Sequence, residues 1–260
     1  MAYLSTHNLI LAIEQRTLCK PLTFEMQTGE TWGILGKNGV GKTTLLHTLA
    51  GLKTSINKPI SDLEINLDGV SINKLSRQTL AKKLGVLLQD FQDVFPSTVL
   101  DTALIGRHPH LKSWQWPDDN DLTLVRNLLK KMDLNNLEER SVTSLSGGER
   151  RRLGLVTLLC QQTEILLLDE PVNHLDIAHQ HTLLKYLTTQ EFKQGHAIGM
   201  VLHDVNLAKQ YCDHILLMFE DGNTLTGRTN EILTADNLTK VYGYPIIELK
   251  SEGKTIFTAN

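Results

Sequence analysis

Apolar and polar residues alternate along the chain up to about residue 30, as in "LILAI" and "LTFEM". A period of two is typical of strands that bury one face, so this stretch predicts antiparallel strands. Farther along, "EINLDG" followed by "VSI" predicts a hairpin. The N-terminal part of the chain is therefore expected to form an antiparallel β subdomain.

Short continuous apolar runs follow, and each has the length of a buried strand. They are "TWGILG", "KLGVLLQ", "ILLLD", "AIGMVLH" and "HILLMF". We expect helices to begin near Lys42, Gly147, Asp176 and Val205, the first of them ending at Gly51. Strands that alternate with helices in this way predict a largely parallel sheet covered by helices, and hence an α/β fold.

Residues 91–145 differ from the rest, because proline, tryptophan and acidic residues replace the apolar runs. Trp114 and Trp116 in this segment are interpreted as packing residues, with a protein interface as the alternative. The stretch "HPHLKSWQWPDDND" then leads into a helical pattern with one apolar face. That face consists of Leu122, Val125, Leu128, Leu129 and Met132. The segment therefore predicts a helix-rich insertion.

The composition is ordinary: 41% of the 260 residues are hydrophobic, 21% are charged, and the net charge is −3. This balance gives no indication of a nucleic-acid partner, and we expect none. The longest apolar runs are shorter than the roughly 18–20 residues that cross a bilayer. Cys19, Cys160 and Cys212 form no CxxC pair, so we expect reduced, buried cysteines in a cytosolic protein.

The stretch "GKNGVGKT" fits the phosphate-loop pattern G-x-x-x-x-G-K-[ST], with a predicted strand before it and a helix after it. Glycines allow the tight turn that points backbone N–H groups at phosphate oxygens, and the helix N-terminus favours negative charge. Lys42 is expected to reach the β- and γ-phosphates, and the Thr43 hydroxyl to bind Mg²⁺. The predicted ATP-binding residues are Gly36, Lys37, Asn38, Gly39, Val40, Gly41, Lys42, Thr43 and Thr44.

The stretch "ILLLDEP" supplies acidic groups at the end of a buried strand. Asp169 is expected beside the metal, and Glu170 is placed to hold or polarise the attacking water. A guanine-specific site generally contains an N-K-x-D loop. Both candidates here, "NKPI" and "NKLS", lack the aspartate. ATP is therefore the expected nucleotide.

In order along the chain, the P-loop, Gln89, "LSGGE", "ILLLDEP", "NHLD" and His203 resemble the motifs of an ATP-binding cassette (ABC) ATPase. The resemblance implies a P-loop NTPase fold of the ABC type, with an N-terminal antiparallel β subdomain and an inserted α-helical subdomain. It also implies one domain over residues 1–260. Within it we expect a RecA-like core of about 1–90 and 160–260 and a helical subdomain of about 91–159.

The resemblance also implies roles for individual residues. Gln89 matches the glutamine that contacts Mg²⁺ and links the ATP site to a transport partner, and Phe91, Val94 and Phe95 after it are expected at the groove that receives that partner. Asp176 matches the aspartate of the loop between subunits. His203 matches the histidine that contacts the γ-phosphate and acts in catalysis together with Glu170 and Lys42. The signature that binds the γ-phosphate consists of Leu145, Ser146, Gly147, Gly148 and Glu149.

The spacing of Ser146 and Glu149 is that of a capping box, so a helix is expected to start there and to offer its N–H groups to an anion. Because each chain has one P-loop and one signature, these are expected to bind different nucleotides. Two copies arranged head to tail would then enclose two ATP molecules in a C₂ homodimer.

Finer features resemble a subgroup of the family. "ALIGRHPHL", "DEPVNHLDIAHQ", "HDVNLAKQYCD" and "EILTADNLTKVYG" are similar to the ATPases of importers for iron–siderophores, haem and cobalamin. This resemblance implies an integral membrane permease as partner, a substrate-binding protein as an indirect one, and a peripheral position on the cytoplasmic face of the inner membrane. The alternatives are another transporter, including an exporter, or a soluble assembly machine.

The chain departs from the family in three places. No aromatic residue stands near Ile13 to stack on adenine, so the base is expected to be selected weakly or to pack on aliphatic side chains. Lys37 stands where proline is common and is interpreted as a solvated loop lysine. In Arg150-Arg151-Arg152 the family prefers glutamine at the middle position, and the run is interpreted as a solvated helix face, with a phosphate contact across the dimer as the alternative.

Overall fold

The computed structural model describes residues 3–13, 16–52, 65–89, 97–112, 114–251 and 254–260. Phe91, Val94 and Phe95, which the sequence places at a partner groove, lie outside the described residues.

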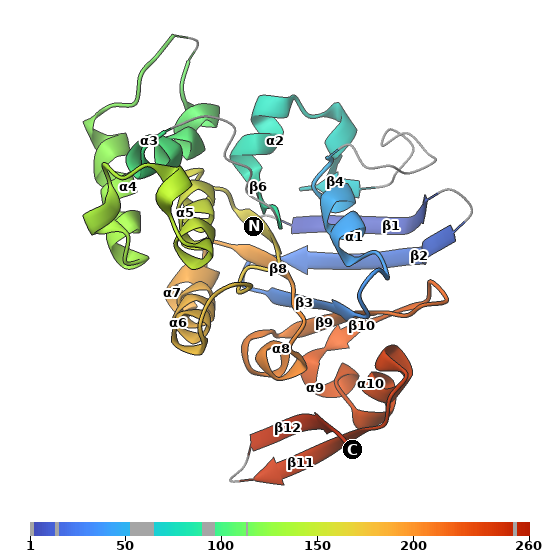
Figure 1. Cartoon of the computed structure of the whole chain (residues 1–260). Coiled ribbons are helices and arrows are strands. Elements are labelled where there is room, and N and C mark those ends of the chain that lie inside the picture. Colours follow the sequence, from blue (N-terminus) through green and yellow to red (C-terminus); the bar gives the residue numbers. More distant parts are fainter. Residues whose placement is uncertain (1–2, 14–15, 53–64, 90–96, 113, 252–253) are drawn as a thin grey trace.

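Parallel strands form the centre of the molecule (Figure 1). The larger sheet has the order β10-β9-β3-β8-β7-β6. Its strands are β3 (Thr31–Gly36), β6 (Leu84–Leu87), β7 (Ile165–Asp169), β8 (Ala197–Val201), β9 (His214–Met218) and β10 (Thr224–Arg228). Neighbouring strands from β9 to β6 are parallel, and β10 runs antiparallel to β9 at the edge. The predicted largely parallel sheet is confirmed.

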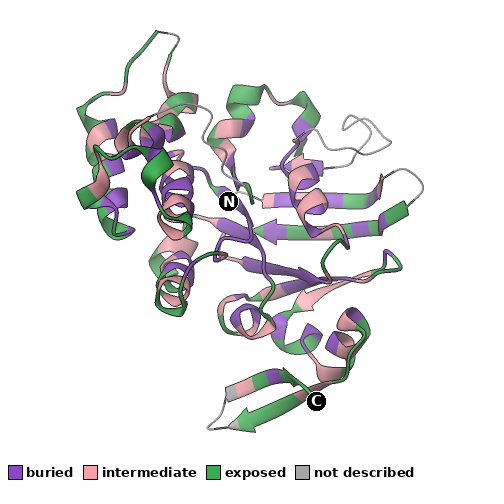
Figure 2. Cartoon of the chain, viewed as in Figure 1, coloured by how far each residue is buried: buried purple, intermediate pink, exposed green. Residues whose placement is uncertain are grey.

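The central strands are apolar along their whole length because both faces of the sheet are covered. Every residue of β3, β7 and β8 is buried. Figure 2 shows these strands as buried segments running through the middle of the molecule. The continuous apolar runs therefore reflect burial on both faces, in contrast to the alternation at the start of the chain.

The smaller sheet is antiparallel and has the order β2-β1-β4-β5. Its strands are β1 (Tyr3–Ile13), β2 (Arg16–Gln27), β4 (Ile65–Leu67) and β5 (Val70–Ser71). Helix α1 (Lys42–Leu49) lies against it, and Leu45 and Leu46 of this helix share a core cluster with Leu4 and Leu67. The predicted antiparallel strands and hairpin are confirmed.

The other elements around the sheets are short. They are η2 (Ile72–Lys74), α2 (Arg77–Lys83), α6 (Ile177–Leu187), α7 (Gln190–Lys193), α8 (Val205–Tyr211), α9 (Thr229–Ile232) and α10 (Ala235–Tyr242). Within the described residues, no helix has the length and apolar character needed to span a bilayer.

Helices between β6 and β7 gather at one end of the molecule (Figure 1). They are α3 (Val99–Leu104), η3 (Ile105–His110), α4 (Asp119–Lys131), η4 (Asn135–Leu137), η5 (Val142–Ser144) and α5 (Gly147–Cys160). Four of the five residues on the predicted apolar face of α4 are buried, and Leu122 is partly buried. The helix-rich insertion is therefore present, and α5 connects it to the sheet.

The C-terminal residues form a hairpin that was not among the expected elements. Strand β11 (Ile246–Ser251) pairs with β12 (Lys254–Ala259). The Asn206 side chain in α8 donates to the Phe257 carbonyl over 3.1 Å and accepts from the Phe257 N–H over 2.8 Å. These two bonds attach the hairpin to the helix that follows His203.

Candidate active site

A glycine-rich loop joins the end of β3 to the beginning of α1. Gly39 and Gly41 have φ angles of 75° and 112°, in the region that favours glycine. Gly41 also packs closely, since a Cβ on it would lie 3.1 Å from the Leu18 side chain. Glycines in this conformation allow the tight turn that a phosphate loop needs at the start of a helix.

Lys42 begins α1 and is only 6% exposed. Its Nζ donates to the carbonyls of Gly36 and Lys37 over 2.8 Å and 3.0 Å. Burial lowers the pKa of Lys42, while the nearby charges of Glu170 and Asp169 act in the opposite direction. The Lys42 ammonium group is thus held by the loop, close to two acids from a distant part of the chain.

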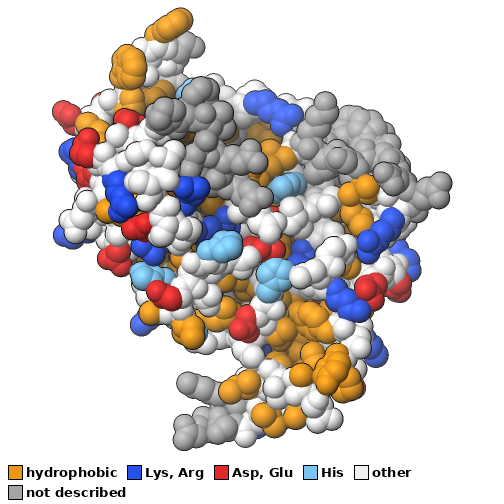
Figure 3. Space-filling view, in the orientation of Figure 1, with side chains coloured by type: hydrophobic (Ala, Val, Ile, Leu, Met, Phe, Trp, Pro, Cys, Tyr) orange, Lys and Arg blue, Asp and Glu red, His pale blue; other side chains and the backbone are white. Residues whose placement is uncertain are grey.

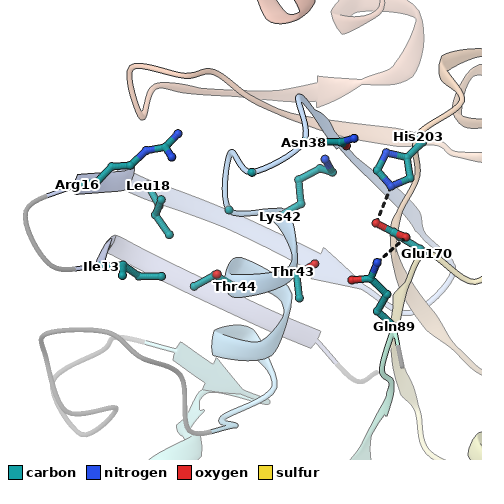
Figure 4. Close-up of a pocket in the computed structure, with 12 residues that line it drawn as sticks. Ile13, Arg16, Leu18, Asn38, Lys42, Thr43, Thr44, Gln89, Glu170 and His203 are labelled. Carbon is teal, nitrogen blue, oxygen red and sulfur yellow. Dashed lines mark hydrogen bonds and ion pairs between the residues drawn. The ribbon is translucent and has the colours of Figure 1, made fainter. Parts of the chain in front are cut away.

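The loop borders a cavity of about 660 Å³, a size that suits a nucleotide (Figure 4). The sticks in Figure 4 come from β1, β2, the loop, α1 and the strand ends on the opposite side. The lining residues are Ile13, Arg16, Leu18, Asn38, Gly39, Gly41, Lys42, Thr43, Thr44, Gln89, Glu170 and His203. The structure therefore brings most of the predicted loop residues together with Gln89, Glu170 and His203.

The other predicted loop residues contribute differently. Gly36 and Val40 are buried and do not line the cavity. The Lys37 side chain is 32% exposed, and its Nζ lies 2.9 Å from Oε2 of Glu220. Lys37 is therefore a partly solvated loop lysine whose side chain also pairs with the turn after β9 at the surface.

Asp169 stands at the end of β7 and is fully buried. The Thr43 hydroxyl donates to its Oδ1 over 3.2 Å. Its buried Oδ2 has no hydrogen-bond partner within the described part of the chain. Burial raises the pKa of Asp169, and a cation beside the carboxylate would offset the cost of burying its charge. Two oxygen donors with an open lone-pair position are chemically suited to Mg²⁺.

Glu170 follows in a left-handed conformation, with a φ of 51°. Nε2 of His203 lies 2.5 Å from its Oε1, and Nε2 of Gln89 lies 3.1 Å from its Oε2. The Asn173 side-chain amide also donates to Oε2. The carboxylate is thus oriented by residues from separate segments. Asn173 was not singled out in the sequence, although it is the first residue of the "NHLD" motif.

Aliphatic side chains occupy the far end of the cavity, and no Phe, Tyr or Trp is among the described residues that line it. Ile13 and Leu18 lie there together with Arg16, which stands opposite Ile13 in the β1–β2 pair. The arrangement agrees with a base that packs on aliphatic side chains. Arg16 was not singled out from the sequence, and its guanidinium adds a flat polar surface beside them.

The signature lies outside this cavity. The Ser146 hydroxyl accepts from the Glu149 N–H over 3.3 Å, and Oε2 of Glu149 accepts from the Ser146 N–H over 2.7 Å. The predicted capping box is therefore confirmed, and α5 begins at Gly147. Leu145 is a buried core residue, whereas Ser146 and Gly147 are exposed. Their exposed surface is open to a second molecule.

Residues of the "NHLD" loop lie against the signature. A Cβ on Gly148 would be 3.1 Å from the His174 carbonyl oxygen. Asp176 caps α6 by accepting from the His179 N–H over 2.8 Å, and it does not line the cavity. The two surfaces expected at a subunit interface are thus neighbours in one chain.

The arginine run is not a solvated face, so that interpretation is wrong. Arg151 is 7% exposed, while Arg150 and Arg152 are partly buried. Most residues of α5 are buried, and Arg151 is one of them.

The packing interpretation of the tryptophans is also wrong. Trp114 and Trp116 are 99% and 85% exposed. Figure 3 shows hydrophobic side chains projecting from the molecule at the segment between η3 and α4. The alternative interpretation, a protein interface, stays a prediction.

Comparison with known proteins agrees with this site. A family model described as "ABC transporter" matches residues 19–173. Among solved structures, an inward-facing metal-chelate type ABC transporter is similar to the chain with a TM-score of 0.82 and 26% identity, over 100% of this chain and 98% of that one. The ADP-bound ATP-binding cassette MJ1267 shares the fold with a TM-score of 0.76 and 20% identity, over 93% of this chain and 98% of that one.

Relatives match along nearly the whole chain. The ferric enterobactin transport ATP-binding protein FepC of Escherichia coli is 33% identical over 94% of this chain and 88% of its own length. The siderophore transport system ATP-binding protein YusV of Bacillus subtilis is 35% identical, over 93% and 86%. The hemin import ATP-binding protein HmuV of Pseudomonas fluorescens is 35% identical, over 94% of each. The chain therefore belongs to the ABC transporter family and is one of its ATP-binding subunits.

Proposed function

We propose that this protein is the ATP-hydrolysing subunit of an importer for a metal chelate of the iron–siderophore, haem or cobalamin type. The observation that carries the proposal is the convergence of Lys42, Thr43, Glu170 and His203 on one cavity, with buried Asp169 hydrogen-bonded to Thr43 behind it. The names of the relatives support the substrate class, since they include transport proteins for ferric enterobactin and hemin.

In this proposal each residue has a separate task. The loop N–H groups and Lys42 bind the phosphates, and Glu170 orients or activates the attacking water. His203 holds the Glu170 carboxylate and contacts the γ-phosphate. Mg²⁺, held by Thr43 and Asp169 with Gln89 nearby, would neutralise negative charge on the phosphates.

A second copy of the chain completes the site. Ser146, Gly147 and Gly148 lie outside the cavity that contains Lys42, so they are offered to the ATP of the partner, and Asp176 lies at the same interface. The segment after Gln89 transmits closure of the dimer to an integral membrane permease, and a substrate-binding protein is involved indirectly. The subunit is then peripheral, on the cytoplasmic face of the inner membrane.

The test is Glu170→Gln, which keeps the shape of the side chain and removes its negative charge. The variant should bind ATP, hydrolyse it at least about 100-fold more slowly, and elute as a dimer in gel filtration with ATP and Mg²⁺. Lys42→Ala is the matched control and should remain monomeric. A monomer in every condition, with wild-type activity linear in protein concentration, would contradict the shared site. Co-purification of the wild type with an integral membrane protein separates a transporter subunit from a soluble machine.

A further inference from the structure

Arg151 joins three backbone segments beneath the active site. Its Nη1 donates to the carbonyls of Leu88 and Gln89 over 2.5 Å and 3.1 Å. Its Nη2 donates to the carbonyl of Asp169. The arginine belongs to α5 and lies five residues after Ser146, so one side chain connects the signature helix to the ends of β6 and β7.

The acceptors lie where two neighbouring strands separate. Strands β6 and β7 pair in parallel as far as Leu87 and Leu168. Beyond this point β6 leads to Gln89 and β7 leads to Glu170, whose side chains are hydrogen-bonded to each other. The Arg151 guanidinium bonds to both chains just past the last pair, at the place where the sheet no longer fixes their separation.

The choice of arginine has a physical consequence. A guanidinium has five N–H donors in a rigid plane, whereas the glutamine that the family prefers here has two. Glutamine therefore cannot donate to these three carbonyl oxygens at once with one bond each. A buried cation is also costly unless its donors are used, which favours an arrangement that keeps all of these contacts.

We propose that Arg151 is a positioning residue that fixes the separation of Gln89 and Glu170 by joining the ends of β6 and β7, and that it links this separation to the orientation of the signature helix. The inference rests on the roles proposed above for Gln89 and Glu170. Arg151 does not line the ATP cavity. It acts through the backbone of residues that do line it.

A glutamine at this position removes the positive charge together with the fork of donors. Lysine would retain the charge but has a compact ammonium group in place of the planar fork.

The experiment compares Arg151→Gln, Arg151→Lys and the control Arg126→Gln. Arg126 lies on α4, where its half-exposed side chain pairs with Glu138 at the surface. Arg151→Gln should lower kcat about tenfold and change the Kd for ATP less than about twofold. The kcat of Arg151→Lys should lie between that of Arg151→Gln and that of the wild type. The kcat of Arg126→Gln should equal that of the wild type. Thermal unfolding and active-site titration of each variant test whether a smaller folded fraction causes the loss of kcat.

A double-mutant cycle with Gln89→Ala identifies the route of the effect. If Arg151 acts by positioning Gln89 against Glu170, Arg151→Gln should lower kcat less than about threefold in the Gln89→Ala background. An equal tenfold loss in both backgrounds, or an unchanged kcat in Arg151→Gln, would overturn the inference. Full turnover in Gln89→Ala with loss in Arg151→Gln would also overturn it. In each of these cases, ATP hydrolysis by the wild type and its loss in Glu170→Gln would still support the proposed function. If Arg151→Gln does not fold, Arg151→Lys enters the same cycle.

Discussion

Gln89 and His203 contact opposite oxygens of the Glu170 carboxylate, at 3.1 Å from Oε2 and 2.5 Å from Oε1. A carboxylate held at both oxygens cannot rotate freely, so its direction depends on two loops that are far apart in sequence. Movement of either loop changes the direction in which Glu170 presents its lone pairs to the cavity.

Replacement of His203 should therefore affect turnover more than binding. His203→Ala removes the contact to Oε1 and is expected to lower kcat about 100-fold, with a much smaller rise in the Kd for ATP from loss of the proposed γ-phosphate contact. Steady-state hydrolysis and binding of a fluorescent nucleotide measure the two effects separately. His7→Ala, at an exposed position on β1, is the control. A variant that retains wild-type kcat would show that His203 does not orient the acid.

Asn173 should have a smaller effect of the same kind. Its amide donates to Oε2 of Glu170, which Gln89 also contacts. Asn173→Ala removes one of these two donors, so we expect kcat to fall about fivefold. Pre-steady-state hydrolysis under single-turnover conditions checks this, because it isolates the chemical step. An unchanged single-turnover rate would assign Asn173 to the structure of the loop alone.

The pair between Arg107 and Asp121 predicts how stability depends on pH. Burial by itself would raise the pKa of Asp121, but the hydrogen bond from Arg107 and that from the Asp118 N–H hold it below its usual value. The native state therefore releases this proton more easily than the unfolded chain. The resulting stability is fully present above the unfolded pKa of about 4, and it is lost as the pH falls through the folded value.

Asp121→Asn should lower the free energy of unfolding by about 2 kcal/mol at pH 7, because a hydrogen bond to a charged group is lost. The difference from the wild type should shrink below about pH 4, as the wild-type carboxylate becomes protonated. Urea unfolding at a series of pH values measures it. A difference that is the same at every pH would show that the charge of Asp121 does not stabilise the fold.

Gly106 of η3 packs closely against α5. A Cβ there would lie 2.0 Å from the Thr157 carbonyl oxygen and 2.8 Å from Cβ of Cys160. Gly106→Ala should therefore lower stability by about 2 kcal/mol, seen as a lower Tm in calorimetry. Gly195→Ala is the control, since its Cβ would lie 3.9 Å from its neighbour. Equal Tm values for the two variants would contradict this close packing.

Local patterns predicted most of the fold and of the site. The capping box at Ser146 and Glu149, the glycines of the loop and the acids after β7 are each determined by a few adjacent residues. Their roles therefore follow from spacing and backbone chemistry. The contact of Asn173 with Glu170 depends on the turn that follows β7, and the conformation of this turn could not be predicted from the sequence.

Other features could not be predicted because burial depends on the surroundings of an element. Three consecutive arginines indicate a polar face, and only the packing of α5 against the ends of β6 and β7 directs Arg151 inward. The opposite error concerns Trp114 and Trp116, because large apolar side chains are usually buried and these are not. The hairpin of β11 and β12 had a usable signal, since "IIELK" and "KTIFTA" are rich in β-branched residues around a glycine.

The left-handed backbone at Glu170 has a consequence for protein engineering. A residue with a Cβ at a φ of 51° costs about 1 kcal/mol relative to glycine, and the contacts of the carboxylate help to offset that cost. Alanine at this position would lose those contacts and keep the strained backbone. Glycine would also lose the contacts, but it would relieve the backbone strain. An inactive form intended for long storage or crystallisation is therefore better made with glycine than with alanine. The difference in Tm between the glycine and alanine variants reports the backbone strain at Glu170.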